Sequence, residues 1–203
     1  MLEAVSVALH GVAVTDMVGD ETVLVIGAGM IGLLLLQSVR AMGCSRVFVS
    51  DLDATRLKLA KDLGADEVIE ASGAALVEKI HGLTDNRGVD VVLEAVGLDA
   101  TVTTAVDCVR KGGTVTLVGN VSPTVMLPLQ KVVSRQIRMQ GSCASSGEYA
   151  QAIELIASGK INVASLITAV APLSDGPSWF DRLHAREPNL MKIVLDPRKE
   201  ATR

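Results

Sequence analysis

The chain has 203 residues, of which 49% are hydrophobic and 2% aromatic, so it can bury one sizeable aliphatic core and still carry an appendage. Its formal net charge of −4 provides none of the basic surface that nucleic acids and acidic membranes require. The three cysteines are odd in number and far apart, and the sequence opens without the segments of a secretory signal. We therefore expect a cytoplasmic protein with reduced thiols and with no nucleic-acid or membrane partner.

The first predicted element is a largely apolar helix from Glu3 to about Val18. The hydrophobic residues recur at the i, i+3, i+4, i+7 spacing of one helix face, namely Val5, Ala8, Leu9 and Val12. This stripe has to pack against another element, so we interpret residues 1–18 as an interdomain helix. His10 lies beside the stripe. We interpret it as a core histidine that bonds to a backbone carbonyl, with a catalytic role as the alternative.

A glycine-rich turn follows a short apolar strand at residues 23–26. In the sequence G-x-G-x-x-G, Gly27 makes the tight turn, Gly29 lets the main chain approach a pyrophosphate, and Gly32 lets the next helix lie close on the strand. That helix, residues 30 to about 42, points free N–H groups and its positive dipole end at the phosphates. The pattern predicts a dinucleotide-binding unit of strand, turn and helix.

The second strand, residues 47–50, ends at Asp51. An acid about 20 residues past the glycines accepts hydrogen bonds from the hydroxyls of an adenine ribose and repels a 2′-phosphate. We therefore expect NAD rather than NADP as the cofactor. A membrane segment is the alternative for the uncharged run from Thr22 to Val39. The glycine spacing and the amphipathic pattern that follows favour a buried strand and helix instead.

Strands and helices alternate along the next part of the chain, and an N-cap residue or a glycine marks each junction. The expected strands are 68–69, 89–94, 114–118 and 137–140, and the expected helices are 54–63, 74–83, 100–110, 129–135 and 148–158. We expect Asp99 to cap the helix at 100–110, and Gly112 with Gly113 to turn it into the next strand. The alternation predicts right-handed βαβ crossovers, and hence an α/β fold with a doubly wound Rossmann sheet of six parallel strands across residues 19–165.

The tail, residues 166–203, has no place in the predicted six-stranded sheet. We expect a strand at 167–171, a helix around 174–186 and a strand at 191–195. Those two strands need a sheet to join, and the parallel sheet is already complete at six. We therefore interpret the tail as a segment built for a partner outside this chain.

Together these residues resemble the medium-chain dehydrogenase/reductase family, and within it the zinc-dependent polyol branch around sorbitol, threonine and galactitol-1-phosphate dehydrogenases. The motifs run along the whole chain in the family's order: EAVSVALHGV, VLVIGAGMIG, DLDATRLKLAKDLGAD, GVDVVLEAVG, RKGGTVTLVG, LITAVAPLSDG and LMKIVL. The resemblance implies an oxidoreductase that moves hydride between a secondary alcohol or polyol and C4 of NAD, in a homo-oligomer that is a dimer or a tetramer. It also implies that the tail completes a GroES-like catalytic domain.

The resemblance further implies a set of cofactor contacts. It places the nicotinamide against Ile31 and its carboxamide near the main chain of Val118, Ser142 and Ala144. Core packing is the alternative for Ile31 and Val118, and a solvated helix charge is the alternative for Arg56 beside the adenine. The expected cofactor-binding residues are Gly27, Gly29, Met30, Ile31, Gly32, Asp51, Arg56, Val96, Gly97, Val118, Gly119, Ser142 and Ala144.

The metal site is where the sequence departs from the family. The three histidines and three cysteines are scattered, without the short ligand spacing of a zinc site, so we expect zinc only together with a missing catalytic domain. Glu3 is the exception, because it falls where the polyol branch has a glutamate beside the catalytic zinc. A helix-entry glutamate stabilised by the helix dipole is the alternative. We interpret Cys143 as an ordinary buried small residue.

Two classes of function follow from this sequence. The first is the NAD-binding half of a zinc-dependent dehydrogenase, in which no residue of this chain is expected to be catalytic. The second is a stand-alone or degenerate dinucleotide-binding module without turnover. A methyltransferase is a third and weaker alternative, because glycine turns with ribose-binding acids recur in that class.

Overall fold

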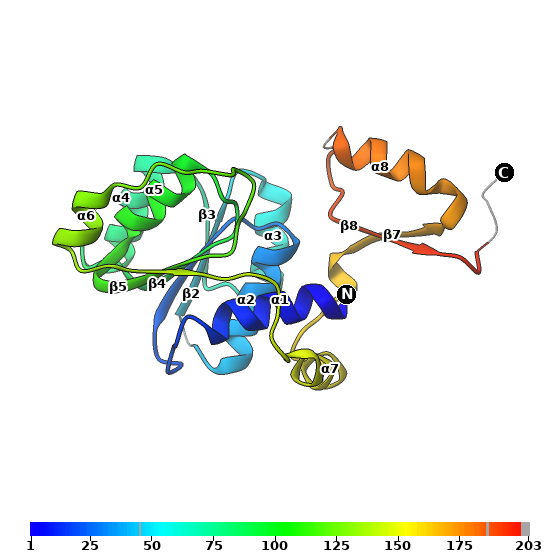
Figure 1. Cartoon of the computed structure of the whole chain (residues 1–203), viewed down its shortest axis with the longest axis horizontal. Helices are drawn as coiled ribbons and strands as arrows, with labels where there is room; N and C mark the ends of the chain where they lie inside the picture. The colour runs from blue at the N-terminus through cyan, green and yellow to red at the C-terminus, as the bar shows by residue number, and fades with distance from the viewer. Residues whose placement is uncertain (45, 186, 200–203) are drawn as a thin grey trace. The chain divides into compact units, whose positions relative to one another are not determined.

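The computed structural model describes residues 1–44, 46–185 and 187–199. The chain divides into two compact units, Met1–Ile161 and Asn162–Arg203, and each is described by itself (Figure 1). The first unit contains every residue that the sequence predicts to bind cofactor, and the second contains the tail.

The first unit is built on a six-stranded sheet in which every neighbouring pair of strands is parallel. The strand order is β3-β2-β1-β4-β5-β6, so the chain builds one half outward from β1 and then returns to build the other half from β4. This is the doubly wound order of a Rossmann fold, and it confirms the predicted fold class. The strands are β1 (Thr22–Ile26), β2 (Arg46–Asp51), β3 (Glu67–Glu70), β4 (Val89–Glu94), β5 (Val109–Leu117) and β6 (Arg138–Gly141).

Helices cover both faces of this sheet. They are α1 (Leu2–Ala13), α2 (Met30–Met42), α3 (Ala54–Asp62), α4 (Gly73–Leu83), α5 (Asp99–Cys108), α6 (Leu129–Ser134) and α7 (Tyr149–Ala157). Figure 1 shows α4 and α5 on one side of the sheet and α1 with α2 on the other, and α1 packs against both α2 and α7. A sheet covered on both faces needs strands that are apolar throughout, which explains the continuous hydrophobic runs in the sequence.

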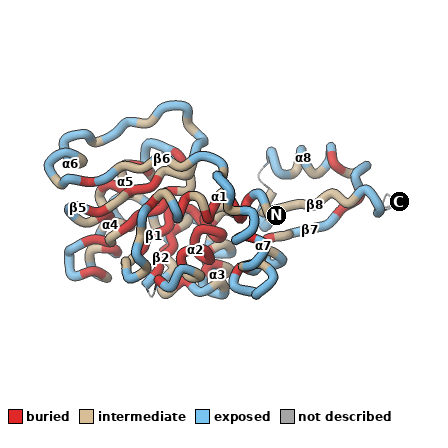
Figure 2. The backbone as a smooth tube through the Cα atoms, turned by 60° about the horizontal axis from the view of Figure 1, so that its bottom comes forward, coloured by how far each residue is buried: buried red, intermediate tan, exposed pale blue. Residues whose placement is uncertain are grey.

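The core lies on both faces of the central strands. Leu24 and Ile26 of β1 join the cluster formed with α4 and α5. Val23 and Val25 alternate with them along the strand, so they point to the opposite face, and both are fully buried. Figure 2 shows the buried residues running through β1, β2 and α2.

The first helix is shorter than predicted, because it ends at Ala13 instead of Val18. The Thr15 hydroxyl donates a hydrogen bond to the carbonyl oxygen of Gly11 at 2.6 Å, and its oxygen lies 2.8 Å from the hydroxyl of Thr116 in β5. The next residue, Asp16, has a left-handed φ of 59°. The chain therefore leaves the helix where Thr15 is fixed against the sheet.

The junction between α5 and β5 also differs from the prediction. The helix predicted at 100–110 ends at Cys108, and β5 begins at the next residue. Gly112 and Gly113 thus lie within the strand and do not form a turn before it. A Cβ atom on Gly113 would lie 2.7 Å from the carbonyl oxygen of Asp90 in β4, so this glycine permits a close approach of two strands.

The second unit contains β7 (Ile167–Pro172), α8 (Gly176–His184) and β8 (Lys192–Asp196), with 3-10 turns at Ala164–Leu166 and Leu173–Asp175. β7 and β8 pair in parallel as a separate two-stranded sheet, and α8 connects them. The helix predicted around 174–186 ends at His184, and Arg186 lies outside the described residues. That the tail completes another domain remains a prediction.

Within the ranges that the structure describes, no helix combines the length and the hydropathy needed to cross a bilayer. The uncharged run from Thr22 to Val39 is divided between β1 and α2. The interpretation of this run as a buried strand and helix is therefore confirmed.

Asp90 joins three segments at the amino end of β4. Its carboxylate accepts hydrogen bonds from Arg110 at 2.6 Å, Arg87 at 2.7 Å and the backbone N–H of Thr22 at 3.0 Å. Burial alone would raise the pKa of Asp90, but these hydrogen bonds outweigh it and hold the pKa below the ordinary value of 3.8. The ionised group therefore stabilises the fold above the unfolded-state pKa, and this contribution is lost as the pH falls through the folded-state pKa.

We expect Asp90→Asn to lower the free energy of unfolding at neutral pH by about 1–3 kcal/mol, because the substitution weakens charge-assisted hydrogen bonds. The difference from the wild type should shrink as the pH is lowered below about 4. Urea unfolding at a series of pH values measures both effects. Two parallel pH profiles would contradict the role given to the Asp90 charge.

Candidate functional site

The predicted cofactor residues gather at the carboxyl edge of the parallel sheet. The glycine turn follows β1, Asp51 is the last residue of β2, and the segments around Gly97, Val118 and Ser142 follow β4, β5 and β6. Because β1 and β4 are neighbours and the chain leaves them toward opposite edges of the sheet, a crevice opens between the segments that follow them. The strand order therefore brings together residues that are far apart in the sequence.

The glycine turn has the geometry that its three glycines predict. Gly27 has a left-handed φ of 98°, and a Cβ atom on it would lie 2.8 Å from Val96 of the segment after β4. A Cβ atom on Gly32 would lie 1.7 Å from the carbonyl oxygen of Gly27, so only glycine allows α2 to lie this close to the turn. Around Gly29, by contrast, no heavy atom beyond the glycine and its two chain neighbours lies within 4 Å of the corresponding position. The middle glycine thus faces open space, as a close approach to a ligand requires.

The N-terminus of α2 lies directly beside this open space. Gly29 is the N-cap, and the partly exposed Met30 and Ile31 form the start of the helix. The first N–H groups of a helix have no partners within the helix, and the helix dipole places positive potential there. Anions are therefore stabilised at this point.

Asp51 ties the end of β2 to the glycine turn. Its Oδ2 accepts a hydrogen bond from the backbone N–H of Ala28 at 2.6 Å, while Oδ1 accepts from Leu52 at 2.7 Å and from Asp53 at 3.0 Å. A carboxylate offers about four acceptor positions, so these bonds leave room for a further donor. The sequence indicated the acid but not its bond to the turn.

Glu94, the last residue of β4, is a functional candidate that the sequence analysis missed. Its side chain is fully buried, and its carboxylate accepts hydrogen bonds from the backbone N–H groups of Val96 and Gly97 at 2.9–3.0 Å. The available signal was an acid at the end of the otherwise apolar strand VDVVLE.

A cleft of about 370 Å³ lies at the carboxyl ends of β5 and β6. Four predicted cofactor residues line it, namely Gly97, Val118, Gly119 and Ser142. Among the described residues, Ser142 Oγ is a buried side-chain oxygen without a hydrogen-bond partner. Ala144, two residues further, is exposed and has a left-handed φ of 54°.

The cysteines differ from the prediction in one respect. Cys143 lines the same cleft and is exposed, so its interpretation as a buried residue is wrong. Cys44 and Cys108 are the buried ones. Burial, together with the charge of Asp107, raises the pKa of Cys108 to about 12. Burial is also the main cause of the raised pKa of Cys44.

His10 is paired with a carboxylate rather than with the backbone carbonyl that we expected. Its Nδ1 lies 2.7 Å from Glu148 Oε1, and both side chains are largely buried. Glu148 Oε2 also accepts a hydrogen bond from the backbone N–H of Ser146 at 2.6 Å. Burial would raise the pKa of Glu148, but the hydrogen bonds from His10 and Ser146 outweigh it, and the pKa lies below its ordinary value. The pair therefore fixes the segment after β6 onto α1.

The structure gives the two remaining candidates no enclosed position. Glu3 is exposed in the first turn of α1. Arg56 is 41% exposed at its side chain and lies 3.6 Å from Asp53, the N-cap of α3. Across the described ranges, no three His, Cys, Asp or Glu side chains are grouped closely enough to hold a metal ion.

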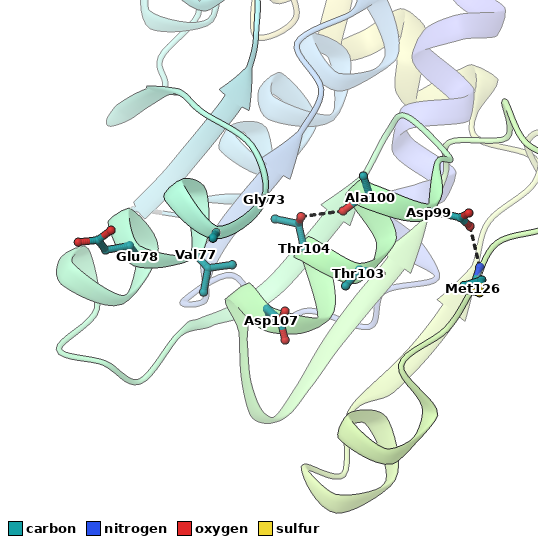
Figure 3. A pocket seen from close by; sticks show the side chains of 10 residues that line it. Gly73, Val77, Glu78, Asp99, Ala100, Thr103, Thr104, Asp107 and Met126 are labelled. Carbon is teal, nitrogen blue, oxygen red and sulfur yellow. Dashed lines mark hydrogen bonds between the residues drawn. The ribbon is translucent and has the colours of Figure 1, made fainter.

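A second hollow, of about 700 Å³, lies between α4 and α5 (Figure 3). Three of its polar side chains are already engaged: Asp99 accepts a hydrogen bond from the backbone N–H of Met126, Thr104 donates to the carbonyl oxygen of Ala100, and Asp107 pairs with Lys131. Asp99 is thus the first residue of α5 and not its predicted cap. None of the predicted cofactor residues lines this hollow.

A doubly wound parallel sheet with a glycine turn after its first strand and an acid at the end of its second defines the dinucleotide-binding class of α/β proteins. Comparison with known families makes the assignment specific. The chain belongs to the zinc-binding dehydrogenase family, whose family model matches residues 31–158. The family resemblance seen in the sequence motifs is therefore confirmed.

Similar proteins are longer than this chain. L-idonate 5-dehydrogenase of Vitis vinifera is 35% identical over 202 residues, which cover 97% of this chain and 55% of that protein. Sorbitol dehydrogenase of Ovis aries is 32% identical over 184 residues, which cover 89% of this chain and 52% of that protein. The protein in a crystal structure from Sinorhizobium meliloti 1021, solved bound to NADP, has 30% sequence identity to this chain, and the two structures superpose with a TM-score of 0.86. The match covers 97% of this chain and 58% of that one. The chain thus spans about half the length of the curated relatives it matches.

The contrast between Gly32 and Gly29 gives a test of the turn. We expect Gly32→Ala to lower the free energy of unfolding by about 3 kcal/mol or more, because the new methyl group would overlap backbone atoms. Gly29→Ala should cost about 1 kcal/mol or less, since its site is open and only the N-cap preference is lost. Thermal or urea unfolding of the two variants measures the difference. Equal losses of stability would contradict the geometry described for the turn.

Proposed function

We propose that this chain is the NAD-binding half of a zinc-dependent dehydrogenase that transfers hydride between a secondary alcohol or polyol and NAD. The observation that carries the proposal is the open space at Gly29, beside the start of α2 and the acid Asp51. Membership of the zinc-binding dehydrogenase family and the polyol dehydrogenases among its relatives support the reaction class.

The residues of this chain fit a dinucleotide. The N-terminus of α2 would hold the pyrophosphate, and the main chain at Gly29 would allow it to approach. Asp51 would accept hydrogen bonds from the adenine ribose, with Arg56 beside the adenine. Ile31, Val118 and the main chain at Ser142 and Ala144 would enclose the nicotinamide ring, in line with the cleft at the ends of β5 and β6. Bound NAD supplies the hydride acceptor at C4, and this chain's part is to bind and orient it.

The described residues do not fit a zinc site, because they contain no group of three potential ligands. We therefore place the zinc ligands in the part of the relatives that this chain does not span. Glu3 would contribute to that site, or else stabilise the start of α1 through the helix dipole. The tail, residues 166–203, would complete the catalytic domain.

Self-association is part of the proposal. β6 is the last strand at one edge of the sheet, and an uncovered edge strand is a ready partner for another chain. Large hydrophobic side chains are exposed nearby in sequence, at Val121, Met126, Leu129 and Val133. A second copy of the chain, in a dimer or a tetramer, would cover them.

A binding module without turnover is the second candidate function. It is favoured by the absence of a metal-ligand group from the described residues. We expect this chain alone to show negligible NAD reduction with a panel of polyols, because its described residues contain no group of ligands that could hold a metal ion to activate an alcohol. Monitoring NADH absorbance at high protein concentration tests this, and measurable turnover would show the prediction to be wrong.

Asp51 provides the test of cofactor choice. We expect Asp51→Ser to weaken NADH binding about tenfold and to narrow the preference for NADH over NADPH, because the acceptor for the ribose and the charge facing a 2′-phosphate are both lost. Fluorescence titration of both cofactors measures the change.

Asp51→Asn is the matched control, since it removes the charge but keeps an oxygen that can bond to the backbone of the turn. A smaller preference for NADH over NADPH in both variants would show that the effect comes from the charge of Asp51. An unchanged ratio of the affinities for NADH and NADPH would remove Asp51 from the explanation.

Wild-type protein that binds S-adenosylmethionine in preference to NADH would instead favour a methyltransferase.

A further inference from the structure

We propose that Glu94 is a positioning residue for the cofactor cleft: it holds the segments after β4 and β5 in register, and so sets the width of the site for the nicotinamide end of NAD. The inference rests on the proposed NAD-binding function and adds a residue to it. Glu94 would not touch the cofactor. It would act through the backbone of the residues that do.

The side chain of Glu94 is buried away from water. A carboxylate without exposure to water is costly unless it is fully hydrogen-bonded. Oε1 of Glu94 accepts from Val96 at 2.9 Å and from Gly97 at 2.9 Å, and Oε2 accepts from Gly97 at 3.0 Å. Within the described residues these partners are all backbone N–H groups of the segment after its own strand. Compensation of the charge therefore depends on the shape of that segment.

The main chain of Glu94 bonds to a second segment, the one after β5. The carbonyl oxygen of Glu94 accepts hydrogen bonds from the N–H groups of Val118 and Gly119, both at 2.9 Å. One residue thus binds N–H groups from two segments, through its side chain on one and through its backbone on the other. A shift of Glu94 has to move both.

The segments after β4 and β5 also contact each other. A Cβ atom on Gly119 would lie 2.3 Å from the backbone nitrogen of Gly97, and one on Gly97 would lie 2.5 Å from the backbone of Gly119. The segments therefore touch through their backbones, without side chains between them that could absorb a displacement. The N–H of Ser122 also bonds to the carbonyl oxygen of Gly97 at 2.9 Å.

This contact between the two segments lies at the cofactor cleft. Gly97, Val118 and Gly119 all line the 370 Å³ cleft, together with Ser142. Because the backbones are in contact, a change in the hydrogen bonds of Glu94 changes the walls of the cleft rather than an adjustable side chain. A displacement of the cleft walls by about 1 Å has a large effect on the geometry of a bound ligand.

The test compares Glu94→Gln with Asp90→Asn in NADH titrations. Both variants convert an acid of β4 to its amide, but Asp90 is at the amino end of the strand and bonds to Thr22, Arg87 and Arg110. The Gln amide keeps one acceptor oxygen and turns a donor toward the N–H of Gly97. We expect Glu94→Gln to weaken NADH binding about tenfold, and Asp90→Asn to change it by less than about twofold even if the melting temperature falls equally.

Glu94→Asp completes the set, because it keeps the charge on a shorter side chain. We expect a loss of affinity smaller than that of Glu94→Gln, and this variant carries the test if Glu94→Gln does not fold. Wild-type affinity in both Glu94 variants would overturn the positioning role, and so would equal losses in Glu94→Gln and Asp90→Asn. Wild-type protein that does not bind NADH would overturn the proposed function itself, and the positioning role with it.

Discussion

The contact between Gly32 and the carbonyl oxygen of Gly27 is the constraint on which the rest of the structure depends. The two backbones lie so close that a single methyl group would not fit between them. As a result, at the carboxyl edge of the sheet, the turn that follows β1 packs directly against the first turn of α2. The free N–H groups of that turn then face the open space at Gly29, and the crevice between β1 and β4 acquires a fixed positive end.

Two acids organise the same edge of the sheet in different ways. Asp51 is partly exposed and uses its carboxylate to join β2 to the glycine turn, with acceptor capacity remaining. Glu94 is fully buried and uses its carboxylate entirely within the protein. Both bond to backbone N–H groups, so both convert the ends of parallel strands into segments of fixed shape. This division follows from exposure: an acid that contacts water can exchange it for a ligand, whereas a buried acid has to be satisfied in advance.

Much of the fold could be predicted from the sequence, because periodicity and glycine spacing report local structure directly. The presence of six strands and the limits of α2 follow from residues within a few positions of each other, and the parallel pairing follows from the alternation of strands and helices along the chain. The predictions are wrong where contacts between residues far apart in the sequence determine the local structure. α1 stops early because Thr15 meets Thr116, and Gly113 lies inside a strand because β4 approaches it. The partner of His10 is 138 residues away in Glu148, which no local pattern could indicate. The glycine turn and Asp51 could be recognised from the sequence because their role depends on spacing. Glu94 could not, because its role depends on burial.

The exposure of Cys143 has a practical consequence. Its thiol borders the cleft, whereas the thiols of Cys44 and Cys108 are buried with raised pKa values and so form little thiolate at neutral pH. An alkylating fluorophore would therefore attach at a single sulfur atom, without any engineered substitution. The emission of that label would report occupancy of the cleft at the ends of β5 and β6 in real time, because Cys143 lines that cleft.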